Sequence, residues 1–390
     1  MNIDPVVIVS YARTPIGGFL GALKGFSATE LGGCAIRATV ERAAFDPGLI
    51  ERAYIGNVLA AGLGQAPARQ AVLGAGLGQG VACTTVSKVC GSGMQAVMAG
   101  YDSIAAGSAQ VVLAGGMESM SNAPYLLQRA RAGLRFGHTQ LTDHMLADGL
   151  EDAYSNGTSM GVFAEATVAR YGFSREEQDD YARLSLRRAR AAAEGTAFAE
   201  EIVSLAVGDL QVSRDEQPGK ADEAKIARLK PAFKVGGSVT AANSSSISDG
   251  AAALLLMRQS RAEALGLTPI AAIRGQASFA HEPQWFSTAP IHAIGHLLGR
   301  VGWSVADVDL FEINEAFAVV VLAAIRELEL DVERVNVNGG ACALGHPIGA
   351  SGARIIVTLL AALAERGLQR GVASLCIGGG EATALAVEML

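Results

Sequence analysis

The feature that most constrains this chain is an order of segments that occurs twice, once at 94–118 and again at 353–381. In each copy a helix with apolar residues on one face stops at a glycine, an apolar strand follows, and the strand ends in a glycine-rich run. The two runs are Gly115-Gly116-Met117-Glu118 and Gly378-Gly379-Gly380-Glu381. Equivalent spacings differ by about two residues, so the pattern indicates a weak internal repeat.

Strands that alternate with helices predict parallel sheets with helices on both faces. Two such halves packed together predict an α/β fold with a layered αβαβα core. We expect an N-terminal half over 1–268, with its core at about 1–118 and 247–268, and a C-terminal half over 269–390. The stretch at about 119–246 is more polar and carries most of the charge runs. We therefore expect it to be an inserted loop domain lying over the core.

Two segments of the insertion have a readable local pattern. Ser174-Arg175-Glu176-Glu177 is a capping box, which predicts a long charged helix that ends near Gly195. The stretch at 209–230 mixes acidic and basic residues with proline and glycine. A solvated loop is the favoured interpretation of such a charge run, and the alternative is that some of its cations meet an anionic ligand.

Composition argues against several classes of protein. The 390 residues carry a net charge of −7, which makes a nucleic-acid partner unexpected. The five cysteines include no CxxC pair, so no disulfide framework is predicted and a reducing, cytoplasmic location fits best. The start, Met1 to Pro5, lacks the basic and apolar regions of a signal peptide. Apolar runs such as Phe317 to Ile325 are too short to span a bilayer, so no membrane association is expected.

Cys90 lies where small and β-branched residues give way to a helical pattern that begins near Met94. A thiol at a helix N-terminus meets unpaired backbone N–H groups and the positive end of the helix dipole, and both favour the nucleophilic thiolate. Gly91 and Gly93 would let a substrate approach the backbone closely. The segment alone leaves a second interpretation equally open, which is a small buried thiol without a reactive role.

Three more candidates, Asn314, His346 and Cys376, fall in loops beside strand ends or helix starts, where α/β sheets bind ligands. Each has a structural alternative: a helix cap for Asn314, a backbone-bonded loop residue for His346, and a core residue for Cys376. His292 and His296 have the i, i+4 spacing of a metal-binding pair. Because no third ligand lies nearby in the sequence, no metal site is predicted.

Four stretches taken together resemble one family. They are Ser87 to Met94, Asn314 to Ala318, Asn336 to Gly352 and Cys376 to Gly380. In this order and with these spacings they resemble the thiolases, the family of acetyl-CoA acetyltransferases and 3-ketoacyl-CoA thiolases. The resemblance covers nearly the whole chain.

The resemblance implies a role for each candidate. Cys90 would be the acylated nucleophile, and His346 would take its proton and help to hold an oxygen anion. Cys376 would be the second thiol, which moves the proton of the α-carbon. Asn314 is similar to the residue that holds a water in the enolate oxyanion site, and the backbone N–H groups of Cys90 and Gly378 resemble the other oxyanion site. The implied reaction is the reversible condensation of two acetyl-CoA to acetoacetyl-CoA plus CoA, with no metal or redox cofactor.

The resemblance also implies a set of residues that line the site for coenzyme A and the acyl group. They are Leu150, Met160, Phe233, Ala241, Ser245, Phe286 and Phe317. Ser159, Ala242 and Glu381 depart from the usual family pattern, as does Phe286, which stands where a methionine often lines the acyl pocket. A bulky Phe286 disfavours long acyl chains, so a short-chain enzyme is expected.

Three other readings stay open at this stage. One is a β-oxidation thiolase that acts on longer 3-ketoacyl-CoA, and another is a non-catalytic acyl-CoA-binding protein on the same fold. A ketoacyl synthase is the third, and the second thiol at Cys376 argues against it. The family further implies a homotetramer or homodimer, with Asn122 to Gly137 resembling the loop used for tetramer contacts.

Overall fold

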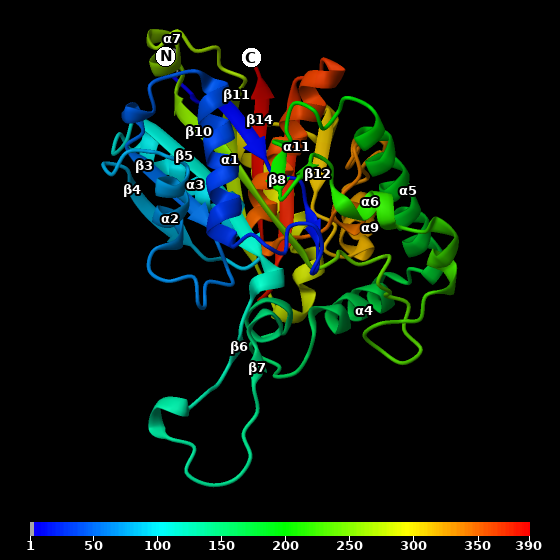
Figure 1. Ribbon diagram of the computed structural model, residues 1–390. Coiled ribbons are helices and arrows are strands. Elements are labelled where there is room, and N and C mark those ends of the chain that lie inside the picture. Colours follow the sequence, from blue (N-terminus) through cyan, green and yellow to red (C-terminus); the bar gives the residue numbers. More distant parts are fainter. Residues whose placement is uncertain (1–3) are drawn as a thin grey trace.

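The computed structural model describes residues 4–390, so 1–3, part of the segment searched for a signal peptide, lie outside the described residues. Its centre is a sheet (Figure 1) whose ten strands among these residues run β12-β13-β14-β11-β1-β10-β5-β3-β4, with β2 on β10. The N-terminal half supplies β1 (Val6–Arg13), β2 (Gly17–Gly18), β3 (Arg52–Gly56), β4 (Ala82–Val86), β5 (Val111–Ser119) and β10 (Ser248–Arg258). The C-terminal half supplies β11 (Ala271–Ala280), β12 (Leu310–Ile313), β13 (Arg370–Ile377) and β14 (Glu381–Met389).

Helices divide the molecule into the five layers that the sequence predicts. In the middle, α3 (Ser92–Ala105) and α11 (Ile348–Arg366) pack against each other and against the inner faces of both halves. The outer face of the N-terminal half is covered by α1 (Ala28–Ala43) and α2 (Pro67–Gly74). On the other side, α8 (Ala289–Val301) and α9 (Ala318–Glu327) cover the C-terminal half. Alternate residues of the buried strands enter different layers, as the twofold period of a strand requires.

The expectation of parallel sheets is wrong for most of the strand pairs. Only β3–β4, β3–β5 and β12–β13 are parallel among the pairs of the large sheet, and the others are antiparallel. In the C-terminal half β14 follows β13 after a short turn and pairs with it, and in the N-terminal half β10 returns beside β5 after the insertion. A direct return gives an antiparallel neighbour, whereas the sequence pattern reveals only that helices and strands alternate.

The repeat is real in three dimensions. In the N-terminal half α3 leads into β5, which pairs with β10, and in the C-terminal half α11 leads into β13, which pairs with β14. The halves differ in the connection between these strands. The N-terminal connection is the insertion, whereas the C-terminal one is only the turn Gly378–Gly380, in which Gly379 and Gly380 have φ of 92° and 87°.

The insertion contains two long helices and several short elements. The helices are α4 (Met160–Tyr171) and α5 (Arg175–Glu194), and the predicted capping box at Ser174 and Glu177 is present. The short elements are β6 (Tyr125–Leu126), β7 (Thr142–Asp143), β8 (Leu205–Val207), β9 (Leu210–Val212) and α6 (Glu216–Lys220). The segment between β6 and β7 projects away from the rest of the molecule (Figure 1).

The charge run at 209–230 is only in part the solvated loop that its composition favours. Asp215 is buried, and its two carboxylate oxygens accept hydrogen bonds of 2.7 and 2.9 Å from the buried guanidinium of Arg13. Glu201 accepts a third bond of 2.8 Å from Arg13. A buried arginine in the first strand therefore anchors this part of the insertion, which is a long-range pairing that local composition does not reveal.

One helix among the described residues, α11, is long and apolar enough to cross a membrane by length and composition. The expectation that apolar runs are too short is therefore wrong for this segment. Its most apolar window is 89% buried inside the protein, as the central layer of the core requires.

Candidate active site

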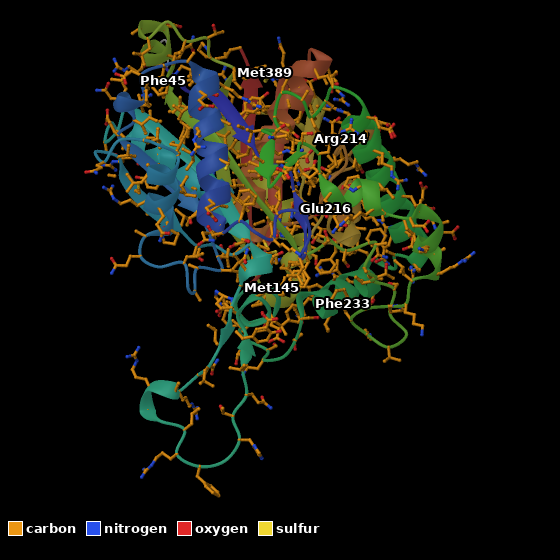
Figure 2. All side chains as sticks on the ribbon, viewed as in Figure 1. Phe45, Met145, Arg214, Glu216, Phe233 and Met389 are labelled. Carbon is orange, nitrogen blue, oxygen red and sulfur yellow. The ribbon has the colours of Figure 1, made fainter. Side chains whose placement is uncertain are left out.

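One cavity of about 380 Å³ lies where the starts of α3 and α11 meet the insertion. It is found at the end of the molecule from which β6 and β7 project, near the labelled Phe233 in Figure 2. The predicted residues that line it are Cys90, Leu150, Met160, Phe233, Ala241, Ser245, Phe286, Phe317, His346 and Gly378. Cys376 and Asn314 do not line it, because their neighbours cover them almost completely.

Cys90 lies on a tight loop between β4 and α3. Val89 has a φ of 44°, which is a left-handed conformation that a β-branched residue rarely adopts. The hydroxyl of Ser92 stabilises the loop, because it accepts a 2.8 Å bond from the N–H of Lys88 and donates a 2.7 Å bond to the carbonyl of Val89. The backbone N–H groups of Gly378 and of Cys90 itself act on the sulfur in the direction that lowers the pKa of the thiol.

The backbone N–H groups at the start of the helix favour the Cys90 thiolate, as expected, but burial acts in the opposite direction and is the larger effect. Burial raises the pKa of the Cys90 thiol to about 11, although the two backbone N–H groups lower it. The nearby carboxyl of Glu118 raises the pKa further. Desolvation outweighs the helix terminus, so Cys90 is a neutral thiol at pH 7 and needs a base.

His346 is placed to be that base. Its Nδ1 lies 2.6 Å from the hydroxyl of Ser351, which also lies 3.0 Å from the carbonyl of Pro347. A carbonyl only accepts, so the hydroxyl proton goes to Pro347 and Nδ1 carries the proton given to Ser351. The ring therefore bonds to a side chain and not to the backbone of its loop, and Nε2 is left without a partner. Burial and then the charge of Arg354 lower the pKa of His346 to about 3, which keeps the ring neutral.

Asn314 directly follows β12, and its amide orientation follows from its neighbour. An arginine can only donate, so the Nη2 of Arg354, 3.4 Å away, faces the Oδ1 of Asn314. The Nδ2 of Asn314 then points elsewhere and has no partner. Arg354 is held by a buried ion pair of 2.9 Å with Glu312. The alternative role as a helix cap is wrong, because α9 begins at Ala318 after Phe317.

Cys376 is the last residue but one of β13 and is completely buried. Burial, and then the neighbouring sulfur of Cys90, raise the pKa of the Cys376 thiol well above its ordinary value. Both thiols are therefore neutral at pH 7. All five cysteines are free, as predicted.

Three phenylalanines form the aromatic wall of the cavity. The ring of Phe317 meets the rings of Phe233 and Phe286 edge-on, with centroids 5.8 and 6.2 Å apart. Sequence reasoning missed part of the lining, which includes Val89, Met120, Leu146, Gly149, Gly161, Ala232, Ser244, Ser246, Ile247, Ala316 and Ile348. Most of these residues are close in sequence to predicted lining residues, and that closeness could have identified them. Of the departures from the family pattern, Ser159 lines this cavity, whereas Ala242 lines a neighbouring one.

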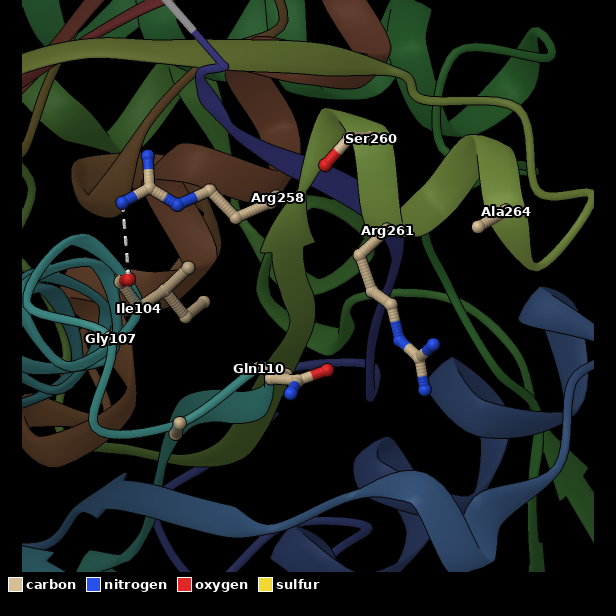
Figure 3. A pocket seen from close by; sticks show the side chains of 8 residues that line it. Ile104, Gly107, Gln110, Arg258, Ser260, Arg261 and Ala264 are labelled. Atoms are coloured by element: carbon tan, nitrogen blue, oxygen red, sulfur yellow. Dashed lines mark hydrogen bonds between the residues drawn. The ribbon is translucent and has the colours of Figure 1, made fainter.

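No group of three or more His, Cys, Asp or Glu residues suited to a metal ion exists within residues 4–390. His292 and His296 instead pack around the ring of Phe279, at centroid distances of 4.5 and 5.4 Å. A second hollow, of about 390 Å³ (Figure 3), lies at the far ends of α3 and β10. Its lining includes Arg258, Ser260 and Arg261 but no cysteine or histidine.

Comparisons with known proteins agree with this arrangement. The family model described as "Thiolase, N-terminal domain" matches residues 6–260, and that described as "Thiolase, C-terminal domain" matches residues 267–389.

Acetyl-CoA acetyltransferase 2 of Arabidopsis thaliana is 52% identical to this chain, and the match covers 100% of this chain and 98% of the Arabidopsis protein. Acetyl-CoA acetyltransferase of Pseudomonas aeruginosa is 49% identical, covering 97% and 98%. The crystal structure of the Ascaris suum Acat5 thiolase in complex with coenzyme A superposes with a TM-score of 0.94 at 42% identity, covering 99% and 100%. The chain belongs to the thiolase family.

Proposed function

We propose that this protein is an acetyl-CoA acetyltransferase, which condenses two acetyl-CoA to acetoacetyl-CoA plus CoA and catalyses the reverse thiolysis. The observation that carries the proposal is the pairing of a thiol with a neutral imidazole in one largely apolar cavity. Cys90 and His346 both line it, and the Nε2 of His346 is free to accept a proton. The relatives named acetyl-CoA acetyltransferase support the same reaction.

In the first half-reaction the Cys90 sulfur attacks the carbonyl of acetyl-CoA as its proton passes to Nε2 of His346. Because the pKa of the thiol is raised and that of the imidazole is lowered, this proton transfer is uphill by itself. It is therefore coupled to the attack, which is general-base catalysis. The N–H groups of Cys90 and Gly378 stabilise the oxyanion. CoA leaves as a thiolate and takes the proton of the neutral Cys376 thiol. The acetyl group stays on Cys90, Cys376 becomes a thiolate, and His346 keeps the proton on Nε2.

In the second half-reaction a new acetyl-CoA loses a methyl proton to the sulfur of Cys376. The enolate oxygen is stabilised by the site that includes the free Nδ2 of Asn314, and by His346 when its Nε2 carries a proton. The enolate carbon attacks the acetyl carbonyl on Cys90, and the bond to sulfur breaks to release acetoacetyl-CoA. The Cys90 sulfur then takes back its proton from His346.

Coenzyme A, as substrate and product, would occupy the rest of the cavity and extend beyond it. A neighbouring hollow of about 320 Å³ shares Ala241 and Ser246 with the catalytic cavity and is lined by Lys220 and Lys225. These lysines belong to the charge run at 209–230, so the alternative of an anionic ligand for that run fits the phosphates of CoA. No metal or redox group enters this scheme.

The proposed function can be tested by comparing the rates of CoA-dependent thiolysis of acetoacetyl-CoA and 3-ketooctanoyl-CoA, with Cys90→Ala as the control. Phe286 is buried and forms part of the wall, so we expect fast cleavage of the four-carbon substrate, loss in the variant, and slow cleavage of the longer one. Preference for the longer substrate would make this protein a β-oxidation thiolase. Cleavage of neither would leave an acyl-CoA-binding protein.

We also propose a homotetramer in the cytoplasm. The projecting segment between β6 and β7 exposes Tyr125, Phe136 and Leu141, and β4 is an edge strand of the large sheet. Exposed apolar tips and unpaired strand edges favour contacts with another copy. Light scattering should give four chains for the wild type and two for Phe136→Ser combined with Leu141→Ser. A monomeric wild type would refute the assembly.

A further inference from the structure

An ion pair joins the two halves of the molecule next to the reactive sulfur. The Nζ of Lys88 bonds to the Oε2 of Glu381. Lys88 lies two residues before Cys90, and Glu381 is the first residue of β14, directly after the turn Gly378–Gly380. The side chains are 24% and 37% exposed, so the pair lies at the surface of the site. It connects the Cys90 loop of the N-terminal half with the turn Gly378–Gly380 of the C-terminal half.

The positions of the loop and the turn relative to each other matter, because each supplies one backbone N–H group that acts on the same sulfur. The donors are the N–H of Cys90 and the N–H of Gly378. The segments also lie close together, since a Cβ on Gly91 would collide with the side chain of Ile377. A small shift of one segment would separate the two N–H groups and weaken the oxyanion site that they form.

The loop is also strained, because Val89 has a φ of 44°. Strained residues persist only where the surrounding structure over-determines them. From the N-terminal half, the hydroxyl of Ser92 holds the loop through Lys88 and Val89. From the C-terminal half, Glu381 holds it through the side chain of Lys88.

We propose that Lys88 and Glu381 are positioning residues, whose ion pair holds the strained Cys90 loop against the Gly378 turn so that the two N–H groups converge on one point. The proposal rests on the proposed function, and it gives Glu381, which departs from the family pattern, a task in catalysis. Neither side chain lines the catalytic cavity.

The kinetic test uses Lys88→Met, Glu381→Gln, the double variant and the charge exchange Lys88→Glu/Glu381→Lys. Partly exposed pairs are weak, so each single variant should lower kcat of acetoacetyl-CoA thiolysis about two- to fivefold, with KM for CoA unchanged. The double variant should be no slower than either single one, and the charge exchange should recover most of kcat.

Glu388→Gln is the matched control. Glu388 lies at the other end of the same strand, β14, and pairs with Arg274 and Arg370 at similar exposure. Its variant should lose an ion pair without changing kcat. An equal loss of kcat in Glu388→Gln, or multiplied losses in the Lys88/Glu381 double variant, would overturn the proposal.

A second readout does not depend on thiolase activity. At pH 8.5 the rate of Cys90 alkylation by iodoacetamide reports the thiolate fraction, with a Cys90→Ala background subtracted. If the pair positions the N–H groups, Lys88→Met and Glu381→Gln both slow alkylation. If the two charges act only through space, Lys88→Met slows it and Glu381→Gln speeds it, which would refute positioning. If the wild type is inactive but both variants slow alkylation, the proposed function is refuted and the positioning role of Lys88 and Glu381 is not.

Discussion

The N-terminal and C-terminal halves place different chemistry at equivalent positions. Cys90 and His346 each lie two residues before a central helix, α3 in one half and α11 in the other. Asn57 and Asn314 each follow the strand that runs parallel to β5 or β13. The nucleophile of one half therefore has the base of the other half as its counterpart.

The same comparison relates Glu118 to Cys376, since each is the last residue but one of its strand. In the N-terminal half the Nδ2 of Asn57 donates a 2.7 Å bond to Glu118, whose oxygens also accept from three backbone N–H groups. In the C-terminal half the Nδ2 of Asn314 has no protein partner. The difference teaches that one copy pairs its asparagine donor with a buried carboxyl and serves structure, whereas the other leaves that donor free for a substrate.

The largest effect should come from breaking the base. His346→Ala removes the acceptor of the Cys90 proton, so kcat for acetoacetyl-CoA thiolysis should fall about 10²- to 10⁴-fold. His144→Ala, at another histidine of the chain that does not line the cavity, should retain activity. A loss of less than tenfold for His346→Ala would show that another group activates Cys90.

The paired asparagines sharpen the comparison most directly. Asn314→Ala removes a free donor and only a 3.4 Å contact, so kcat should fall about 10²-fold or more while the melting temperature is nearly unchanged. Asn57→Ala leaves a buried carboxyl without one of its donors, so unfolding should become easier by about 1–3 kcal/mol with a smaller loss of kcat. If the two variants lost kcat and stability to the same extent, the assignment of Asn57 to structure and Asn314 to catalysis would be contradicted.

The carboxyls of the two halves predict how stability depends on pH. Burial raises the pKa of Glu118 to about 7 and that of Glu312 to about 8, above their unfolded value of 4.5. The folded protein therefore binds more protons than the unfolded chain between pH 4.5 and 8, so stability falls as pH rises through this window. Urea unfolding should give a lower free energy of unfolding at pH 8 than at pH 5.5. In Glu118→Gln the change should shrink, and an unchanged dependence would exclude Glu118 as a cause.

The smallest expected effect concerns the acyl wall, which the C-terminal half supplies through Phe286. Phe286→Met gives a more flexible side chain, so cleavage of 3-ketooctanoyl-CoA relative to acetoacetyl-CoA should rise about tenfold. Phe279→Met, on a phenylalanine that does not line the cavity, is the control. No change in the ratio would place the chain-length limit elsewhere.

The sequence allowed the repeat, the five layers and the insertion to be predicted, because periodicity and glycine stops are local signals. It could not give the direction of strand pairing, which depends on where the chain returns. Leu146 and Ile348 were missed as lining residues because apolar side chains carry no mark of whether they face a core or a cavity. The neutral state of Cys90 was missed for a related reason, since burial by distant segments outweighs the helix terminus beside it.

The raised pKa of Cys90 has a consequence for oxidative stress. Peroxides attack the thiolate and not the thiol, so a reactive cysteine that rests as a neutral thiol resists conversion to sulfenic acid. With a pKa of about 11, Cys90 exposes little thiolate to hydrogen peroxide at neutral pH. Inactivation by peroxide should therefore be slow at pH 7 and accelerate steadily toward pH 10. The burial that makes this enzyme depend on a base also protects it from irreversible oxidation between turnovers.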